Sequence, residues 1–239
     1  MIQGGTPLSG EMVAAGNKNA ALPILAACLL TEEELRIGNV PRIRDVDSML
    51  DLLRALGVKV DWSGENEVRL QADAVDESHE VDEEPASRIR ASFLAAGPLL
   101  ARFGEAKLPP PGGDTIGRRR LDAHLDAFKD MGAKVGGDTW IELEAPPDGL
   151  KATRIFMDEP SVMGTENALM AAALPPGPTT LANAASEPHV QDLARLLCKM
   201  GAQVDGIGSN VMTVHGRDKL GGAEHRVCPD HIEIASFMA

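Results

Sequence analysis

The sequence has few cysteines, no long apolar run and no excess of positive charge, and each shortage excludes a class of protein. Its three cysteines are Cys28, Cys198 and Cys228, an odd number without CxxC spacing, which argues against a disulfide framework or a zinc site. No segment approaches the ~20 apolar residues of a membrane-spanning helix, and the start "MIQGGTPLSG" lacks the basic and apolar regions of a signal peptide. We therefore expect a cytoplasmic protein that does not associate with a membrane.

The formal net charge of −13 argues against a nucleic-acid partner, because proteins that bind nucleic acids usually present a basic surface. Anionic small substrates are compatible with this charge only if basic residues gather locally. The chain has 239 residues, of which 44% are hydrophobic, so it can bury a substantial core in one large domain or two small ones.

Three stretches end alike, in "LLRALGVKV", "AFKDMGAKV" and "LLCKMGAQV", and this recurrence predicts repeated supersecondary units. Apolar residues keep helical spacing before each glycine, so Gly57, Gly132 and Gly201 are expected to end amphipathic helices in the left-handed conformation. An alternating segment with a turn of Gly, Asn, Asp or Ser follows each glycine and predicts a β-hairpin.

A second helix, rich in small residues, is expected before each amphipathic one, in "NKNAALPILAACLL", "RIRASFLAAGPLLARF" and "TENALMAAALPPG". Small side chains let elements pack closely, so we expect these helices to be buried and the charged ones to lie outside. Short segments such as "LRIGNV" link the two helices as strands. The predicted fold class is α/β (α+β), built of three helix, strand, helix, hairpin units.

The last residues, "DHIEIASFMA", echo "SRIRASFLAAG" and are expected to open a fourth unit within its first helix. This pattern favours the front part of a longer protein. The alternative is a frayed C-terminal tail.

The segment "PPPGGDTIGRRR" places Asp114 between two glycines, Gly112 and Gly113, and three consecutive arginines. Glycine permits close approach to a ligand, and the guanidinium fork suits phosphate or carboxylate because it binds two oxygens at once. On composition alone, a mobile surface loop with a solvated run of charge is the favoured interpretation.

Five motifs in order and spacing carry a resemblance to a known family: "GNKNAALPILAACLL", "RIRASFLAAGPLLARFG", "PGGDTIGRRRLDAHL", "PSVMGTENALMAAAL" and "NAASEPHVQDLARLL". The chain resembles the UDP-N-acetylglucosamine enolpyruvyl transferases, a 1-carboxyvinyltransferase family, from about Gly4 to Ala239. The resemblance implies an inside-out α/β barrel domain. It also implies that residues 1–17 associate with another, mostly missing domain, that 18–228 form the lid-bearing domain of three repeats, and that 229–239 begin the second domain.

The resemblance further implies a reaction that transfers enolpyruvate from phosphoenolpyruvate to the 3′-hydroxyl of UDP-N-acetylglucosamine and releases phosphate. This is the first committed step of peptidoglycan precursor synthesis, and the family needs no metal or organic cofactor. The expected partners are these two substrates and the second domain. The fragment alone is expected to be inactive, because the family's other domain supplies the base that activates the sugar hydroxyl.

By the same resemblance, Lys18 and Asp114 are the expected catalytic residues. Lys18 holds phosphate and Asp114 gives a proton to C3 of phosphoenolpyruvate. Asn19 orients the sugar, while Arg90 and Arg119 face the substrates. The other substrate-binding residues that the motifs imply lie in two segments: Arg120, Leu121, Asp122, Ala123, Glu159, Pro160, Ser161 and Val162. For Leu121, a place in the helix core is equally open.

Asp114 departs from the pattern of most family members, which carry there the cysteine that fosfomycin alkylates. An aspartate keeps a proton donor but removes the soft nucleophile, so acid chemistry is retained and alkylation is not. The competing interpretation of the whole chain is a non-catalytic UDP-sugar-binding or assembly module. Nearby residues have plainer interpretations, with Ser186 as the N-cap of the third outer helix and His124 as a surface histidine.

Overall fold

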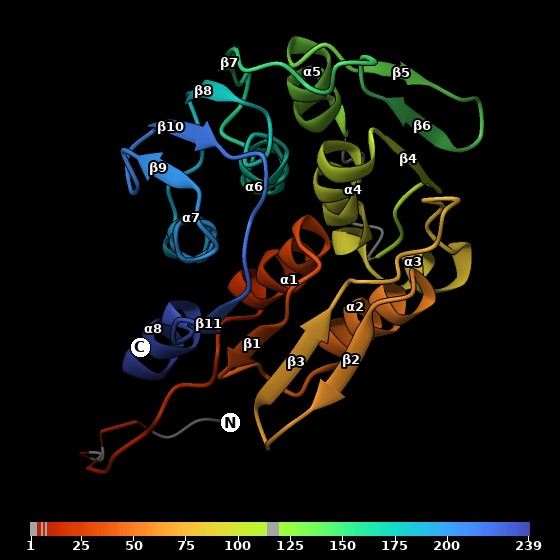
Figure 1. Ribbon diagram of the computed structural model, residues 1–239. Helices are drawn as coiled ribbons and strands as arrows, with labels where there is room; N and C mark the ends of the chain where they lie inside the picture. Colours follow the sequence, from red (N-terminus) through yellow and green to blue (C-terminus); the bar gives the residue numbers. More distant parts are fainter. Residues whose placement is uncertain (1–3, 6, 8, 114–119) are drawn as a thin grey trace.

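The computed structural model describes residues 4–5, 7, 9–113 and 120–239. Its helices gather in the interior and its three β-sheets lie around them, with strands exposed on the outside (Figure 1). This is the inside-out α/β arrangement that the resemblance predicts. The chain visits helix, strand, helix and hairpin in three successive stretches, which the next paragraph defines by their bounds.

The first stretch contains α1 (Lys18–Ala26), the 3-10 helix η1 (Ala27–Leu30), β1 (Leu35–Gly38), α2 (Arg44–Ala55), β2 (Lys59–Trp62) and β3 (Glu67–Gln71). The second contains α3 (Glu83–Arg88), the 3-10 helix η2 (Arg90–Ala95), α4 (Ala96–Phe103), β4 (Glu105–Leu108), α5 (Asp122–Asp130), β5 (Lys134–Gly136) and β6 (Ile141–Glu144). The third contains β7 (Arg154–Phe156), α6 (Val162–Ala171), β8 (Gly177–Ala182), α7 (Pro188–Lys199), β9 (Gln203–Asp205) and β10 (Val211–Gly216). The chain ends with β11 (Ala223–Arg226) and α8 (His231–Met238).

The three sheets share one strand pattern, in orders β11-β1-β3-β2, β7-β8-β10-β9 and β4-β6-β5. In each, the strand between the two helices pairs antiparallel with the second strand of its hairpin. A parallel neighbour lies on its other side, namely β11 on β1, β7 on β8 and a single bridge from Glu80 to Lys107 on β4. Because β11 comes from the end of the chain and β1 from its start, their pairing closes the ring of sheets.

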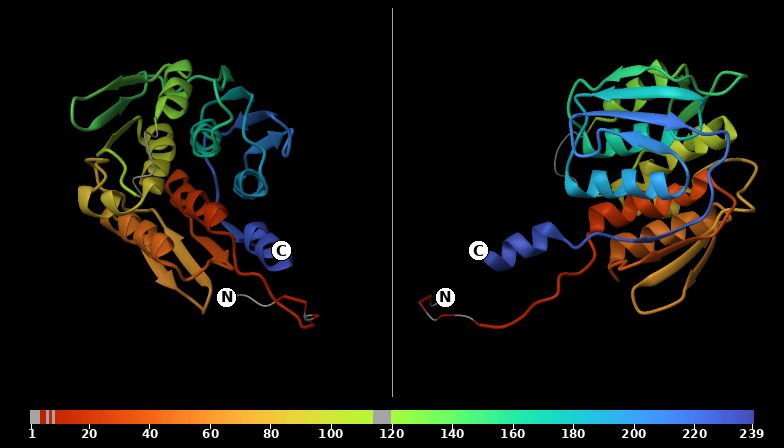
Figure 2. Two further views of the ribbon diagram at one scale, coloured as in Figure 1. Left: turned by 180° about the vertical axis from the view of Figure 1, so that it is seen from behind. Right: turned by 60° about the vertical axis from the view of Figure 1, so that its left-hand side comes forward.

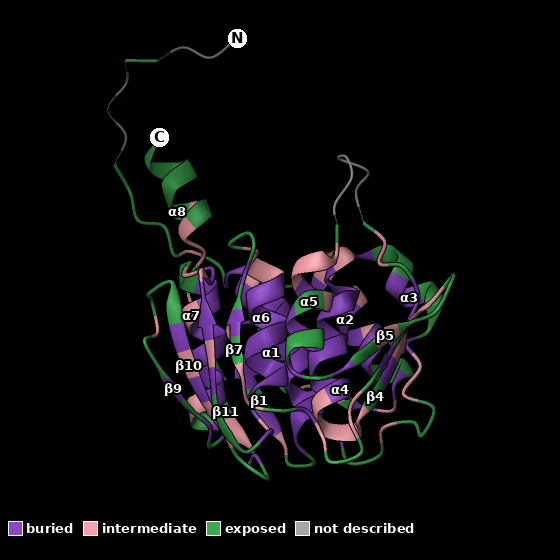
Figure 3. Cartoon of the chain, turned by 90° about the horizontal axis from the view of Figure 1, so that it is seen from above, coloured by how far each residue is buried: buried purple, intermediate pink, exposed green. Residues whose placement is uncertain are grey.

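The small-residue helices form the core, as predicted. Residues Ala20 to Ala26 of α1 are buried, as are Gly164 to Ala171 of α6 and Ala91 to Leu100 of η2 and α4. The helices α2 and α7 bury one face and expose charged residues on the other (Figure 3). Alanine and glycine leave little side-chain volume, so the inner helices approach one another closely and exclude water.

The outer helices end in the same hydrogen-bonded turn, also as predicted. Gly57, Gly132 and Gly201 have φ angles of 89°, 93° and 113°. In each case the next residue donates its amide hydrogen to a carbonyl five residues back, as Val58 does to Leu53. This motif satisfies carbonyls that the helix end leaves open, and it turns the chain directly into a strand.

One buried side chain ties the inner helices of the second and third stretches together. Asn167 of α6 accepts a hydrogen bond from the Gly97 amide at 2.9 Å and donates one to the Phe93 carbonyl at 2.9 Å. A Cβ at Gly97 would lie 2.6 Å from the Asn167 carbonyl oxygen, so only glycine allows this approach.

Residues 9–17 and helix α8 extend from the same side of the body of the protein (Figure 2). Gly16 pairs with Pro229 in an isolated bridge, and Ala15 both accepts from the Asp230 amide and donates to the Glu233 carboxylate. Helix α8 has no buried residue. Among the residues described, none of the helices combines the length and apolarity that crossing a membrane requires.

Replacing Gly97 with alanine should destabilise the protein by about 1–3 kcal/mol, the usual effect of forcing an extra carbon into a packed core. The added Cβ collides with the backbone of Asn167, and this outweighs the better helix propensity of alanine. Urea unfolding of both proteins measures the change. Gly136→Ala is the matched control, because nothing lies within 4 Å of a Cβ there. Equal unfolding free energies for Gly97→Ala and Gly136→Ala would contradict the close approach.

Candidate functional site

A cavity of about 770 Å³ lies where α5, α6 and the start of η2 meet. It gathers residues that are far apart in the sequence and that the motifs had singled out. The predicted site residues that line it are Arg90, Arg120, Asp122, Ala123, Glu159, Ser161 and Val162. Three sequence motifs therefore contribute to one cavity.

Helix ends explain why these residues meet. Asp122 begins α5 and Val162 begins α6, and Ser161 caps α6 by accepting a hydrogen bond from the Gly164 amide at 3.2 Å. Gly164 sits so close to α5 that a Cβ there would lie 3.0 Å from the Cβ of Ala123. Two helix N-termini consequently open on the same cavity, and the partial positive charge of each favours an anion.

Two arginines add full positive charge to this end of the cavity. The Arg120 guanidinium binds both carboxylate oxygens of Asp122 at 2.7 Å, and Arg90 donates from Nη2 to the Arg120 carbonyl at 2.9 Å. The Arg120 side chain is largely exposed, so the pair with Asp122 can open when an anion competes. The lining also contains the carboxylates of Asp126, Asp130 and Asp158. Burial raises the pKa of Asp130, and Asp126 and Asp158 act in the same direction.

His124 is buried, which corrects its interpretation as a surface histidine. Its side chain is spaced three residues after Leu121 and four before the buried Phe128, so it lies on the inner face of α5 rather than with the charged residues. The Asn167 amide donates to His124 Nδ1 at 2.9 Å, and Phe93 meets the ring edge-on. Burial lowers the pKa of His124 to about 3, with Arg90 acting in the same direction. The imidazole is therefore neutral, and because Nδ1 accepts, its proton is on Nε2.

Lys18 and Asn19 lie at the start of α1, outside the lining of this cavity. Asn17 caps α1 by accepting from the Ala20 amide at 2.9 Å. Lys18 Nζ contacts Asp45 Oδ2, in the first turn of α2, at 2.8 Å, and both side chains are about half exposed. Helix α1 packs against η2, the element that begins with Arg90.

The remaining predicted site residues are not among the described residues that line the cavity. Asp114 and Arg119 lie outside the described residues, so their roles remain predictions. Leu121 precedes α5 and packs against the core. Pro160 is exposed beside the cavity lining.

The first turn of α7 differs from the sequence interpretation. Its N-cap is Glu187 and not Ser186, because Pro188 occupies the first helical position, and no side chain makes a capping hydrogen bond there. Glu166 of α6 is buried nearby, and its pKa is raised well above the ordinary value by burial and by Glu187. Within the described part of the chain, no group of three His, Cys, Asp or Glu residues is arranged to hold a metal ion.

The buried histidine makes stability depend on pH in a defined direction. An unfolded histidine has a pKa near ~6.5, so below that pH the unfolded state binds a proton that folded His124 takes up only near pH 3. The stability from neutral His124 is complete above pH 6.5 and should fall by up to about 1.4 kcal/mol per pH unit below it. Urea unfolding at pH 4–7 should show the advantage of the native protein over His124→Gln shrinking as pH falls. Parallel curves for the native protein and His124→Gln over this range would refute the assignment.

Comparison with known proteins agrees with the motifs. Two curated relatives, from Bradyrhizobium diazoefficiens and Treponema denticola, are both called UDP-N-acetylglucosamine 1-carboxyvinyltransferase. Each is 51% identical over 238 residues and matches 100% of this chain, which covers 54% and 55% of the relatives, respectively. The chain thus spans about half the length of the curated relatives that it matches.

Solved structures show the same fold. The enolpyruvyl transferase NikO from Streptomyces tendae aligns with a TM-score of 0.81 and 25% identity, over 99% of this chain and 56% of that one. An EPSP synthase from Acinetobacter baumannii aligns with a TM-score of 0.72 and 19% identity, over 96% of this chain and 52% of that one, and this likeness concerns the fold alone. The family model described as EPSP synthase (3-phosphoshikimate 1-carboxyvinyltransferase) matches residues 2–239, so the chain belongs to that family.

Proposed function

We propose that this chain supplies the nucleotide-sugar half of an enzyme that transfers enolpyruvate from phosphoenolpyruvate to the 3′-hydroxyl of UDP-N-acetylglucosamine. The single observation that carries the proposal is the cavity between η2, α5 and α6, which brings together the residues implied for UDP-sugar binding. The names of the curated relatives support the same substrate.

The charges of the cavity fit a nucleotide sugar. Arg90, Arg120 and two helix N-termini suit a diphosphate, because each offers hydrogen-bond donors to anionic oxygens. The carboxylates of the lining, Glu159 among them, suit the hydroxyl and N–H donors of ribose and uracil. The protein carries a net charge of −13, so a local group of arginines is needed to attract an anion at all.

The chemistry assigns distinct tasks to the other residues. In the addition step, C3 of phosphoenolpyruvate gains a proton. The sugar hydroxyl loses its proton to a base, and its oxygen bonds to C2. In the elimination step, C3 loses a proton and the C2–O bond to phosphate breaks. We assign Lys18 and Arg119 to the phosphate and carboxylate charges, and Asp114 to the donation of the first proton. The base comes from the second domain of the same enzyme.

The chain ends support a division into domains. We assign residues 18–228 to the lid-bearing domain of three repeats, residues 1–17 to a segment that associates with a second domain, and residues 229–239 to the start of that second domain. Ile232 and Phe237 of α8 are 52% and 68% exposed, and residues 9–17 extend from the same side of the body as α8. A second domain would cover these apolar side chains.

The alternative is a UDP-sugar-binding or assembly module without catalysis. It needs the cavity but has no use for Lys18 beside Asp45 or for a proton donor at position 114. The two proposals differ in phosphate release, whereas both expect UDP-N-acetylglucosamine to bind.

A chimera that joins this chain to the second half of a curated relative should release phosphate from phosphoenolpyruvate and UDP-N-acetylglucosamine. The 239-residue chain alone should release essentially none, because the base is absent. A colorimetric phosphate assay measures both, with shikimate 3-phosphate as the alternative acceptor. Robust turnover by the chain alone would contradict the two-domain site. A chimera that binds the nucleotide sugar without releasing phosphate would favour the binding module, and preference for shikimate 3-phosphate would change the assigned substrate.

In that chimera, Asp114→Asn should lower kcat by about 10²-fold or more while UDP-N-acetylglucosamine binding changes little, because the amide cannot donate the proton. Steady-state kinetics and calorimetric titration separate the two effects. Asp114→Cys is the matched control, since it restores a donor and should gain a fosfomycin adduct by intact mass that Asp114 does not form. Near-normal turnover of Asp114→Asn would show that the proton comes from elsewhere.

A further inference from the structure

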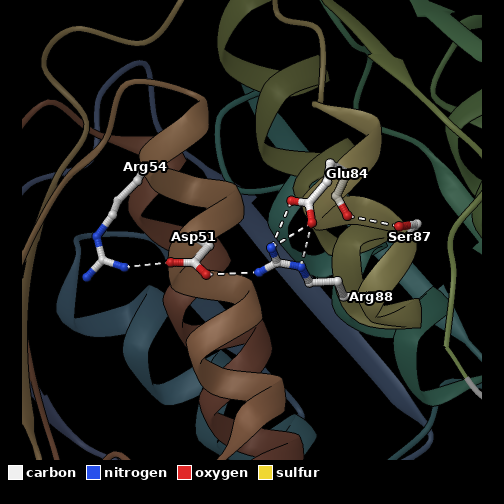
Figure 4. A network of polar contacts seen from close by, with 5 residues as sticks. All are labelled: Asp51, Arg54, Glu84, Ser87 and Arg88. Atoms are coloured by element: carbon white, nitrogen blue, oxygen red, sulfur yellow. Dashed lines mark hydrogen bonds and ion pairs between the residues drawn. The ribbon is translucent and has the colours of Figure 1, made fainter.

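Arg88, the last residue of α3, binds the carboxylates of Glu84 and Asp51 outside the cavity (Figure 4). Its Nε and Nη2 atoms bind Glu84 Oε1 at 3.1 and 2.7 Å, and Nη2 also binds Glu84 Oε2 at 2.9 Å. Its Nη1 atom reaches across to Asp51 Oδ2 of α2 at 3.0 Å. Asp51 in turn accepts a hydrogen bond from Arg54 at 2.9 Å on its other oxygen. The guanidinium fork therefore links the end of α3 to the middle of α2.

The junction between α3 and η2, residues 86–90, supports the chain on both sides of residues 114–119. On one side, the Gly112 amide donates to the Ala86 carbonyl at 3.2 Å. On the other side, Arg90 donates to the Arg120 carbonyl at 2.9 Å. The two residues of the junction that make these contacts, Ala86 and Arg90, are each two positions from Arg88.

Gly112 and Gly113 lie so close to this junction that there is no room for a side chain. A Cβ at Gly112 would lie 1.7 Å from the Ser87 carbonyl oxygen, and one at Gly113 would lie 3.0 Å from the Arg90 amide nitrogen. Gly113 also has a φ of 93°, which other residues rarely adopt. A small displacement of the junction must therefore displace the backbone at 112–113 with it.

The same helix α2 also reaches the start of α1. Asp45, in its first turn, contacts Lys18 at 2.8 Å, and Asp51, further along, contacts Arg88 at 3.0 Å. One rigid helix thus carries the partners of both basic residues. The position of Lys18 relative to Arg90 is set through α2.

We propose that Arg88 is a positioning residue: its ion pair with Asp51 fixes the 86–90 junction on α2, so that Arg90, Gly112, Gly113 and Arg120 keep their places relative to Lys18. Arg88 itself is not among the residues that line the cavity. The expected effect of Arg88 on ligand binding rests on the proposed function, whereas its expected effect on the position of Gly112 does not.

The pair is exposed at the surface, so it contributes little to global stability. Several charges joined in one network are more effective than one isolated pair, and a bidentate fork restricts geometry as well as distance. We accordingly expect a local effect on the junction and almost none on global unfolding.

Hydrogen exchange at glycine amides tests the local effect in the 239-residue chain. In Arg88→Gln, the Gly112 amide should exchange about two- to fivefold faster, the fold-change typical of losing an exposed charged pair. Gly132, whose amide donates to the Lys129 carbonyl at 2.8 Å far from the junction, is the internal reference. Arg54→Gln removes the other partner of Asp51 without touching α3, so it is the matched control and should leave Gly112 unchanged. Arg88→Lys keeps the charge but loses the fork, and should give an intermediate rate.

Calorimetric titration with UDP-N-acetylglucosamine tests the effect on ligand. Arg88→Gln should weaken binding by about two- to fivefold, in parallel with exchange at Gly112, while Arg54→Gln binds normally. Unchanged exchange at Gly112 in Arg88→Gln, or faster exchange at Gly112 and Gly132 alike, would overturn the positioning role. Faster exchange at Gly112 with unaltered binding would overturn its link to the cavity. If the native chain binds no nucleotide sugar, the proposed function of this half fails, and the exchange experiment still decides the role of Arg88.

Discussion

The hydrogen bonds of one buried amide, Asn167, hold the cavity together. This side chain joins α6 to Gly97, to the Phe93 carbonyl and to His124 of α5, so three elements that line or support the cavity share one polar residue. Buried polar groups are tolerated only when their hydrogen bonds are made, and this requirement gives the three elements one relative position. The glycine at position 97 and the neutral imidazole of His124 both follow from it.

Electrostatics then decide what the cavity can accept. The chain is strongly acidic overall, yet Arg90, Arg120 and the N-termini of α5 and α6 all contribute to the lining. Neutral His124 adds no charge beside Arg90, because burial and Arg90 both keep its pKa low. The two arginines and the two helix N-termini are therefore the features of the cavity that favour an anion.

Particular residues show how far sequence patterns reach. The predicted helix ends at Gly57, Gly132 and Gly201 are confirmed, because a left-handed glycine followed by a β-branched or small residue is a local signal. The buried inner helices are confirmed as well. Their small and apolar residues lie on all sides of the helix, and such a helix is typically buried. His124 and Ser186 were misjudged for local reasons. The apolar spacing from Leu121 to Phe128 would have placed His124 inside, and Pro188 at the first helical position would have moved the cap to Glu187.

Sequence alone determined the types of elements, their order and the residues of the motifs, because periodicity, turn chemistry and motif spacing are properties of short segments. Only the tertiary structure decided that Arg90, Asp122 and Ser161 line one cavity while Lys18 contacts Asp45 beside it. It alone also linked Arg88 to Asp51 and joined His124 to Asn167. Such contacts depend on how helices from distant segments pack, and packing distances of a few ångströms are not encoded in any local pattern.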